Sequence, residues 1–133
     1  MEAHDTDVST GISGLDELLA GGLTGNRLYL VEGYPGTGKT TLAMQFLLQG
    51  RDRGEKTLYV TLSENVHELE AVARSHGWSL DGIELFQFSQ AESLKSEDQY
   101  TLYHPGEVEL GETVKAVLER IESGSPNRVV FDS

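Results

Sequence analysis

Apolar positions along the chain follow two periods, one typical of buried strands and one typical of amphipathic helices. Short apolar runs predict strands over residues 27–33, 56–65, 83–89 and 127–133. Apolar positions spaced by three and four residues predict helices over residues 10–26, 39–54, 66–78 and 108–124. Strands that alternate with helices of this length predict an α/β fold, in which a parallel sheet carries helices on both faces.

The same spacing predicts which helical side chains enter the core. They form one apolar stripe on each helix: Leu15, Leu18, Leu19; Leu42, Ala43, Phe46, Leu47; Val66, Leu69, Val72, Ala73; and Val114, Val117, Leu118, Ile121. Residues 1–9 are acidic and polar and are expected to be a flexible lead-in. Residues 90–107 are polar with little periodicity, which predicts an exposed loop that is longer than usual.

Composition narrows the class of protein. The 133 residues suit a single domain with a core of useful size, and no apolar window reaches the length of a membrane span. The polar N-terminus is unlike a signal or transit peptide, so we expect a cytoplasmic protein. The chain has no cysteine, and its net charge of −12 opposes binding to a nucleic-acid backbone. We therefore expect no membrane and no nucleic acid among its partners.

A phosphate-binding loop stands between the first predicted strand and the next helix. Gly33, four residues, Gly38, Lys39 and Thr40 match the pattern G-x-x-x-x-G-K-[ST]. Glycines allow the backbone to turn successive N–H groups toward phosphate oxygens, and the lysine adds a cation near the β- and γ-phosphates. The residues that we assign to nucleotide binding are Gly33, Tyr34, Pro35, Gly36, Thr37, Gly38, Lys39, Thr40 and Thr41.

Two carboxylates follow predicted strands and are candidates for the chemistry. Asp132 ends the last strand, where it would lie beside the phosphate loop and hold Mg²⁺ through water, opposite the hydroxyl of Thr40. Glu64 follows the second strand and would orient the water that attacks the γ-phosphate. The same glutamate also suits the first turn of a helix for electrostatic reasons alone, so both interpretations stay open.

With these residues in place, the chain resembles the KaiC-like branch of the RecA superfamily of P-loop ATPases. The resemblance covers residues 9–133 through the series TGISGLDELLAGGL, GYPGTGKTTLAMQFL, LYVTLSEN, ARSHGWSLDG and RVVFDS. It implies ATP binding with Mg²⁺, slow hydrolysis, and often a hexameric ring with nucleotide between subunits. It also implies that transfer of phosphate to the chain's own Ser or Thr residues is a variant of the activity, and that signalling proteins are candidate partners.

The chain departs from the family pattern in two places. Where the family commonly carries two adjacent glutamates, this chain reads Ser63-Glu64, so we carry Glu64 as the catalytic candidate together with Lys39. Family members also continue past the aspartate, with a strand that lies between the strands that lead to Lys39 and Asp132. Since its absence would leave backbone groups unpaired on both neighbours, we expect residues 10–133 to be the front part of a longer ATPase domain.

These observations leave two classes of function. The first is a Mg²⁺-dependent, ring-forming ATPase with a regulatory or signalling role. The second is a nucleotide-sensing interaction module that binds ATP without hydrolysing it. A recombinase-like, DNA-dependent ATPase is disfavoured by the net charge of −12.

Overall fold

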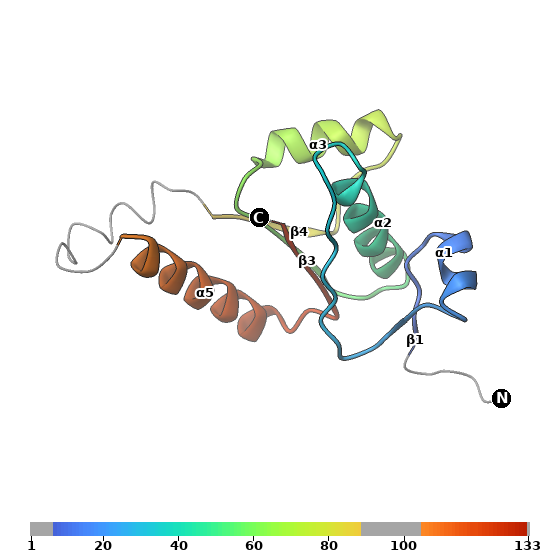
Figure 1. Ribbon diagram of the computed structural model, residues 1–133, viewed down its shortest axis with the longest axis horizontal. Helices are drawn as coiled ribbons and strands as arrows, with labels where there is room; N and C mark the ends of the chain where they lie inside the picture. The colour runs from blue at the N-terminus through green and yellow to red at the C-terminus, as the bar shows by residue number, and fades with distance from the viewer. Residues whose placement is uncertain (1–6, 89–104, 133) are drawn as a thin grey trace.

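A three-stranded parallel sheet with helices on both faces is the centre of the fold. The computed structural model describes residues 7–88 and 105–132. The strands are β3 (Thr57–Thr61), β4 (Glu84–Gln87) and β5 (Arg128–Asp132), in the order β4-β3-β5. Helices α2 (Lys39–Asp52) and α3 (Val66–Ser75) lie on one face and α5 (Pro105–Gly124) on the other (Figure 1). The predicted fold class is confirmed, as are the positions of these six elements.

The middle strand joins the two halves of the core. Tyr59 of β3 packs with Met44 and Leu47 of α2 on one face of the sheet. Leu58 and Val60 point to the other face and pack with the α5 residue Val117. Every residue of β3 is buried, which explains why its apolar residues 58–60 follow one another without alternating with polar ones.

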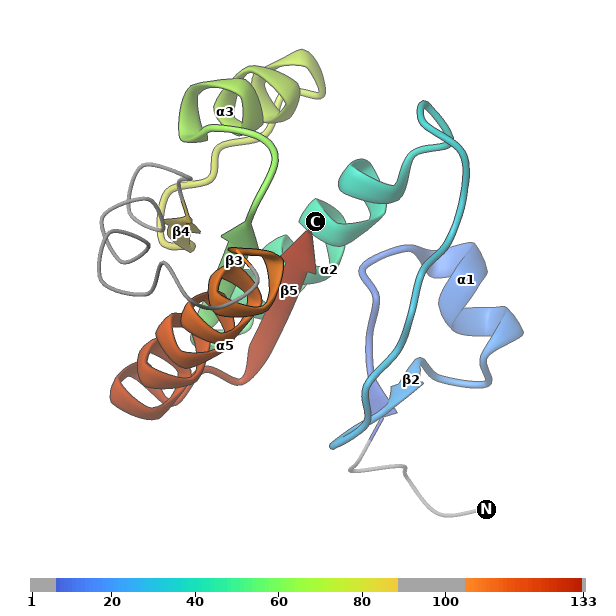
Figure 2. The same cartoon turned by 60° about the vertical axis from the view of Figure 1, so that its left-hand side comes forward.

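The strands are in a register that brings their carboxyl ends together. Thr61, the last residue of β3, lies opposite Gln87 of β4 and Asp132 of β5. The chain therefore leaves all three strands at the same edge of the sheet, next to the N-terminal end of α2 (Figure 2). This is the edge at which open α/β sheets bind their ligands.

The first predicted helix is shorter than expected. Helix α1 (Ser13–Leu18) has six residues and is followed by β2 (Leu23–Thr24), which pairs antiparallel with β1 (Asp7–Val8). Leu18 and Leu19 are 86% and 40% exposed, so their prediction as core residues was wrong. Helix α1 is too short to pack an apolar stripe against the sheet. Strand β1 contains two residues that were expected to belong to the flexible lead-in.

The predicted strand over residues 27–33 does not form. This segment has no strand assignment, and Leu28 and Leu30 are 98% and 82% exposed. Figure 2 shows it on the side of α1, apart from β5. A strand needs a partner for its backbone groups, and within the described residues β5 pairs only with β3. The apolar run therefore remains unpacked in this chain.

Helix α5 is only partly covered by the sheet. Val117 is buried and Ile121 packs beside it, as predicted, but Val114 and Leu118 are 48% and 53% exposed. Among the described residues the sheet has three strands, and half of the apolar stripe is left about half exposed. The predicted loop over residues 90–107 lies outside the described residues as far as residue 104, and α5 already includes Pro105. No helix of the described segments is long and apolar enough to cross a membrane.

A buried arginine fastens the N-terminal segment to the sheet. Arg128 is 3% exposed; its Nε donates to Glu55 at 2.7 Å and its Nη1 donates to the carbonyl oxygens of Ser9 and Phe46 at 2.6 and 2.8 Å. Its guanidinium also lies 4.8 Å from the centre of the Phe46 ring. A Cβ on Gly50 would come within 2.6 Å of the arginine side chain, which explains a glycine inside a helix.

We expect Arg128→Met to lower the free energy of unfolding by about 3 kcal/mol, because it leaves a partly buried Glu55 and two carbonyl groups without their donor. Arg120 provides a matched control: it also pairs with a glutamate, Glu84 at 2.8 Å, and lies 4.7 Å from the ring of Phe86, but its side chain is 42% exposed. Arg120→Met should cost less than about 1 kcal/mol. Urea unfolding followed by circular dichroism measures both, and equal losses would contradict the anchoring role of Arg128.

Candidate nucleotide site

The predicted phosphate loop leads directly into the first turn of α2. Gly38 is the N-cap of this helix in the left-handed region, with φ of 98°, and no side chain caps the helix. In the described structure, the backbone N–H groups from Gly38 to Thr41 have no protein acceptor. A row of free donors with the positive end of the helix dipole behind it is suited to bind an anion.

The predicted lysine bends back over this loop. Nζ of Lys39 donates to the carbonyl oxygens of Gly33 and Tyr34 at 2.5 and 3.1 Å. The hydroxyl of Thr37 also donates to the Tyr34 carbonyl, at 2.8 Å. The loop thus holds its own cation in place, on a surface where residues 33–38 are exposed. The side chain of Tyr34 is 85% exposed and contributes only its backbone to this arrangement.

The two predicted metal ligands meet at the edge of the sheet. Oγ1 of Thr40 lies 3.4 Å from Oδ2 of Asp132, although the two residues are far apart in the sequence. A third side chain joins them, since the hydroxyl of Tyr59 donates to the same Oδ2 at 2.6 Å. Burial, followed by the carboxylate of Asp132, raises the pKa of Tyr59 well above its ordinary value, so that the hydroxyl stays protonated and donates.

Glu64 lies at this edge in a turn that ends β3. Thr61 Oγ1 accepts the Glu64 N–H at 3.0 Å and donates to the Glu64 carbonyl at 2.9 Å. Burial raises the pKa of the Glu64 carboxyl, and the nearby charges of Asp132 and Glu68 raise it further. A carboxylate with a raised pKa beside a phosphate site is suited to act as a base or to orient water.

Two residues near the site could not be recognised from the sequence. Tyr59 stands in an apolar run with several similar residues, and only its hydroxyl group distinguishes it from them. Nε2 of His76 lies 3.4 Å from the hydroxyl of Thr41, and the His76 ring stacks on Trp78 with centroids 4.6 Å apart. Thr41, in the first turn of α2, therefore lies beside the stacked rings of His76 and Trp78.

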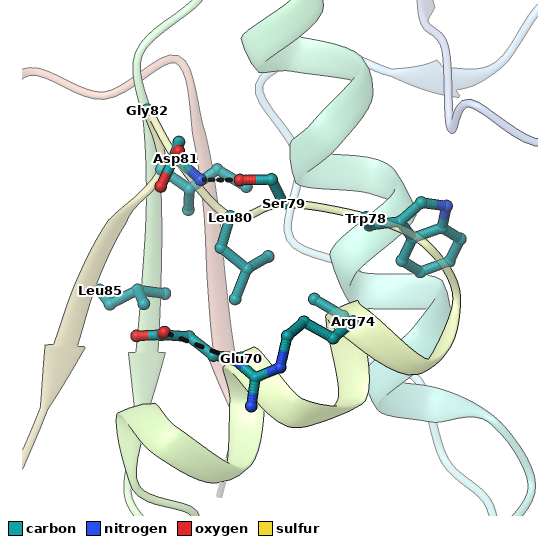
Figure 3. Close-up of a pocket in the computed structure, with 10 residues that line it drawn as sticks. Glu70, Arg74, Trp78, Ser79, Leu80, Asp81, Gly82 and Leu85 are labelled. Atoms are coloured by element: carbon teal, nitrogen blue, oxygen red, sulfur yellow. Dashed lines mark hydrogen bonds and ion pairs between the residues drawn. The ribbon is translucent and has the colours of Figure 1, made fainter.

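A hollow of about 430 Å³ lies elsewhere, between α3 and the segment that leads into β4 (Figure 3). Leu80 and Ile83 line its apolar part, and Glu70 and Arg74 pair with each other across 3.9 Å at its rim. None of its lining residues belongs to the phosphate loop. The open surface over the loop, with its free donors and convergent side chains, is the better candidate site because a triphosphate chain binds along exposed backbone.

The donor atoms at this site fit Mg²⁺ and a nucleotide phosphate. A threonine hydroxyl and a carboxylate are hard oxygen ligands of the kind that Mg²⁺ prefers, and few protein ligands suffice because phosphates and water supply the rest. Free N–H groups and a lysine ammonium suit the phosphates. Within the described residues, no group of three or more His, Cys, Asp or Glu side chains is arranged to bind a metal by itself.

Comparison with known proteins agrees with this geometry. A family model described as "ATPase: KaiC" matches residues 8–133. A UPF0273 protein of Pyrococcus horikoshii is 32% identical over 132 residues, covering 95% of this chain and 53% of the relative. The circadian clock protein KaiC3 of Synechocystis is 31% identical over 129 residues, covering 95% of this chain and 25% of the relative.

A third relative matches the chain over a shorter stretch. The circadian clock oscillator protein KaiC of Picosynechococcus is 43% identical over 77 residues, covering 57% of this chain and 15% of the relative. This chain therefore spans at most about half the length of the relatives described.

The raised pKa of Glu64 predicts a pH-dependent stability. The folded state holds this proton more tightly than the unfolded state, so stability falls as pH rises from the ordinary value of 4.5 through the raised pKa. We expect Glu64→Gln to stabilise the fold at pH 7 by about 0.5 kcal/mol. This gain should disappear below the ordinary pKa of a glutamate carboxyl, because both side chains are then neutral. Thermal unfolding between pH 4 and 8 measures this. Glu70→Gln on α3 is the control, and an equal gain there would contradict the assignment.

Proposed function

The chain belongs to the KaiC-like family of ATPases in the RecA superfamily, and from this premise we propose that it binds ATP with Mg²⁺ and hydrolyses the nucleotide. The observation that carries the proposal is the convergence of Thr40 and Asp132 at the N-terminal end of α2, 3.4 Å apart, beside a loop with free N–H donors. A loop that merely turned a strand into a helix would not need a hydroxyl and a carboxylate in contact at its end.

Each residue has a distinct task in this proposal. The N–H groups of the loop and the ammonium of Lys39 bind the phosphates and stabilise charge on the transferring group. Thr40 and Asp132 hold Mg²⁺, which when bound neutralises charge on the β- and γ-phosphates. Glu64 orients the attacking water and accepts its proton, for which its raised pKa is suited.

We also propose that residues 10–133 are the front part of a larger ATPase domain, preceded by the short lead-in. The exposed Leu28 and Leu30, the open edge of β5, and the exposed Val114 and Leu118 all support this. A further strand between β5 and residues 27–33 would bury these apolar groups and pair the free backbone. The relatives, of which this chain spans 53% and 25%, support the same proposal.

In that longer protein we propose a cytoplasmic homo-oligomeric ring, hexameric by family resemblance, with a regulatory or signalling role and protein partners of that kind. Transfer of phosphate to Ser or Thr residues of the protein itself would be a variant of the same chemistry. The net charge of −12 argues against DNA-dependent action.

A second candidate function rests on one observation, the serine at position 63 where the family commonly has a glutamate. With one carboxylate in place of two, the site would bind ATP and change conformation without turnover. Glu64 is the residue that separates the two functions, because its carboxylate is the acid–base group expected to act on the water.

Phosphate release from Mg²⁺-ATP, measured on the full-length protein that carries this chain, tests the proposal. We expect Lys39→Ala to reduce turnover by about a hundredfold or more and to weaken ATP binding, because it removes the cation of the loop. Glu64→Gln should reduce turnover by about a hundredfold while ATP binding is retained. Lys56→Ala and Glu70→Gln, which change charge away from the site, serve as matched controls.

The outcomes distinguish the candidates. If the wild type bound ATP tightly but did not hydrolyse it, the nucleotide-sensing function would be supported and the ATPase function would be excluded. Full turnover in Glu64→Gln would remove Glu64 from the mechanism, and absence of Mg²⁺-dependent ATP binding by calorimetry would overturn the nucleotide site itself.

A further inference from the structure

The hydroxyl of Tyr59 is a polar atom at the end of an otherwise buried side chain. Tyr59 is 1% exposed, and its ring packs in the core between the sheet and helices α2 and α3. A phenylalanine would fill the same space, so packing explains the ring but not the oxygen. The oxygen lies where the core meets the candidate site, 2.6 Å from Oδ2 of Asp132.

The hydrogen bond of Tyr59 is the shorter of two on the same carboxylate oxygen. At 2.6 Å it has the length of a charge-assisted bond between a hydroxyl and a carboxylate, whereas Thr40 Oγ1 lies 3.4 Å from that oxygen. Tyr59 therefore fixes the orientation of the Asp132 side chain more tightly than Thr40 does, and its hydroxyl also interacts with the Thr40 side chain.

The second oxygen of Asp132 remains open. Among the described residues, Oδ1 receives no hydrogen bond. Because both hydroxyls converge on Oδ2, Oδ1 is left as the oxygen of this carboxylate that can accept a further ligand. If the hydroxyl of Thr40 left Asp132 to bind the metal, the hydrogen bond from Tyr59 would still hold the carboxylate in place.

We infer that Tyr59 is a positioning residue for Mg²⁺: its hydroxyl holds Asp132 in the orientation in which the carboxylate serves the metal bound with ATP. The inference rests on the proposed function and adds to it a residue that touches neither nucleotide nor metal. It is drawn from the two bonds on Oδ2 and the burial of the tyrosine ring. Groups that orient a metal-binding side chain commonly change metal affinity when they are removed.

A purely structural role makes a different prediction. A buried hydroxyl needs a hydrogen-bond partner, and Asp132 would then be merely the acceptor nearest to Tyr59. In that case, loss of the hydroxyl would change the stability of the fold but not the response to Mg²⁺. The two roles are therefore separable by measuring nucleotide affinity with and without the metal.

The test is calorimetric titration of the full-length protein with ATP, in EDTA and at a series of Mg²⁺ concentrations. For Tyr59→Phe we expect the affinity for ATP in EDTA to be unchanged. Mg²⁺ should still raise the affinity for ATP, but the Mg²⁺ concentration at which half of this rise is reached should be about tenfold higher than in the wild type. In Asp132→Asn the metal dependence should already be weak. Adding Tyr59→Phe should then change it much less than Tyr59→Phe does in the wild type, because the tyrosine acts mainly through that carboxylate.

Tyr29→Phe is the matched control, because it also removes one tyrosine hydroxyl. Within the described segments, that hydroxyl bonds the backbone of Thr24, outside the site. Thermal unfolding checks that each variant is folded. An unchanged Mg²⁺ response in folded Tyr59→Phe, or an equal loss of affinity in EDTA and in Mg²⁺, would overturn the inference while the proposed function stands. A wild type without any gain from Mg²⁺ would overturn both.

Discussion

The two parallel ladders on either side of β3 are the constraint on which the rest of the structure depends. They place the carboxyl ends of β3, β4 and β5 at one edge, so that Asp132 and the turn that contains Glu64 lie close to each other. Helix α2 packs on the same strands through Met44 and Leu47, which fixes its first turn at that edge. The phosphate loop, the carboxylates and the buried tyrosine meet because the sheet is parallel and in this register, although they come from distant parts of the sequence.

The part of the site that could be predicted from the sequence is the part governed by local rules. The spacing from Gly33 to Thr40 requires only a strand-like run and a helix start around it, and an aspartate that ends a parallel strand has a predictable place. Residues 27–33 and Leu118 were predicted wrongly as buried, because burial requires a neighbour as well as an apolar side chain. Tyr59 escaped prediction because a tyrosine in a buried strand looks like any other core residue until the position of its hydroxyl is known.

The glycine-bracketed N-terminal segment, which is the most distinctive part of the family resemblance, is fixed to the sheet by polar contacts more than by apolar packing. Asp16 accepts hydrogen bonds from Ser9 and Thr10; burial alone would raise the pKa of its carboxyl, but these bonds and the charge of Arg128 lower it. Arg128 then ties the Ser9 carbonyl to β5. This explains why a segment in which Leu18 and Leu19 are exposed still has a defined place beside the core. It also explains why α2 carries a glycine at position 50.

The free side of β5 has a practical consequence. A strand edge that pairs with no other strand in the described part of the chain, with half-exposed Phe131 beside it, is a template on which another chain can add its own backbone. The exposed leucines before the phosphate loop add to this tendency. If residues 1–133 were expressed alone, we would expect them to aggregate through these edges. Multimers formed in this way would reflect sheet extension between copies and would say nothing about the proposed ring.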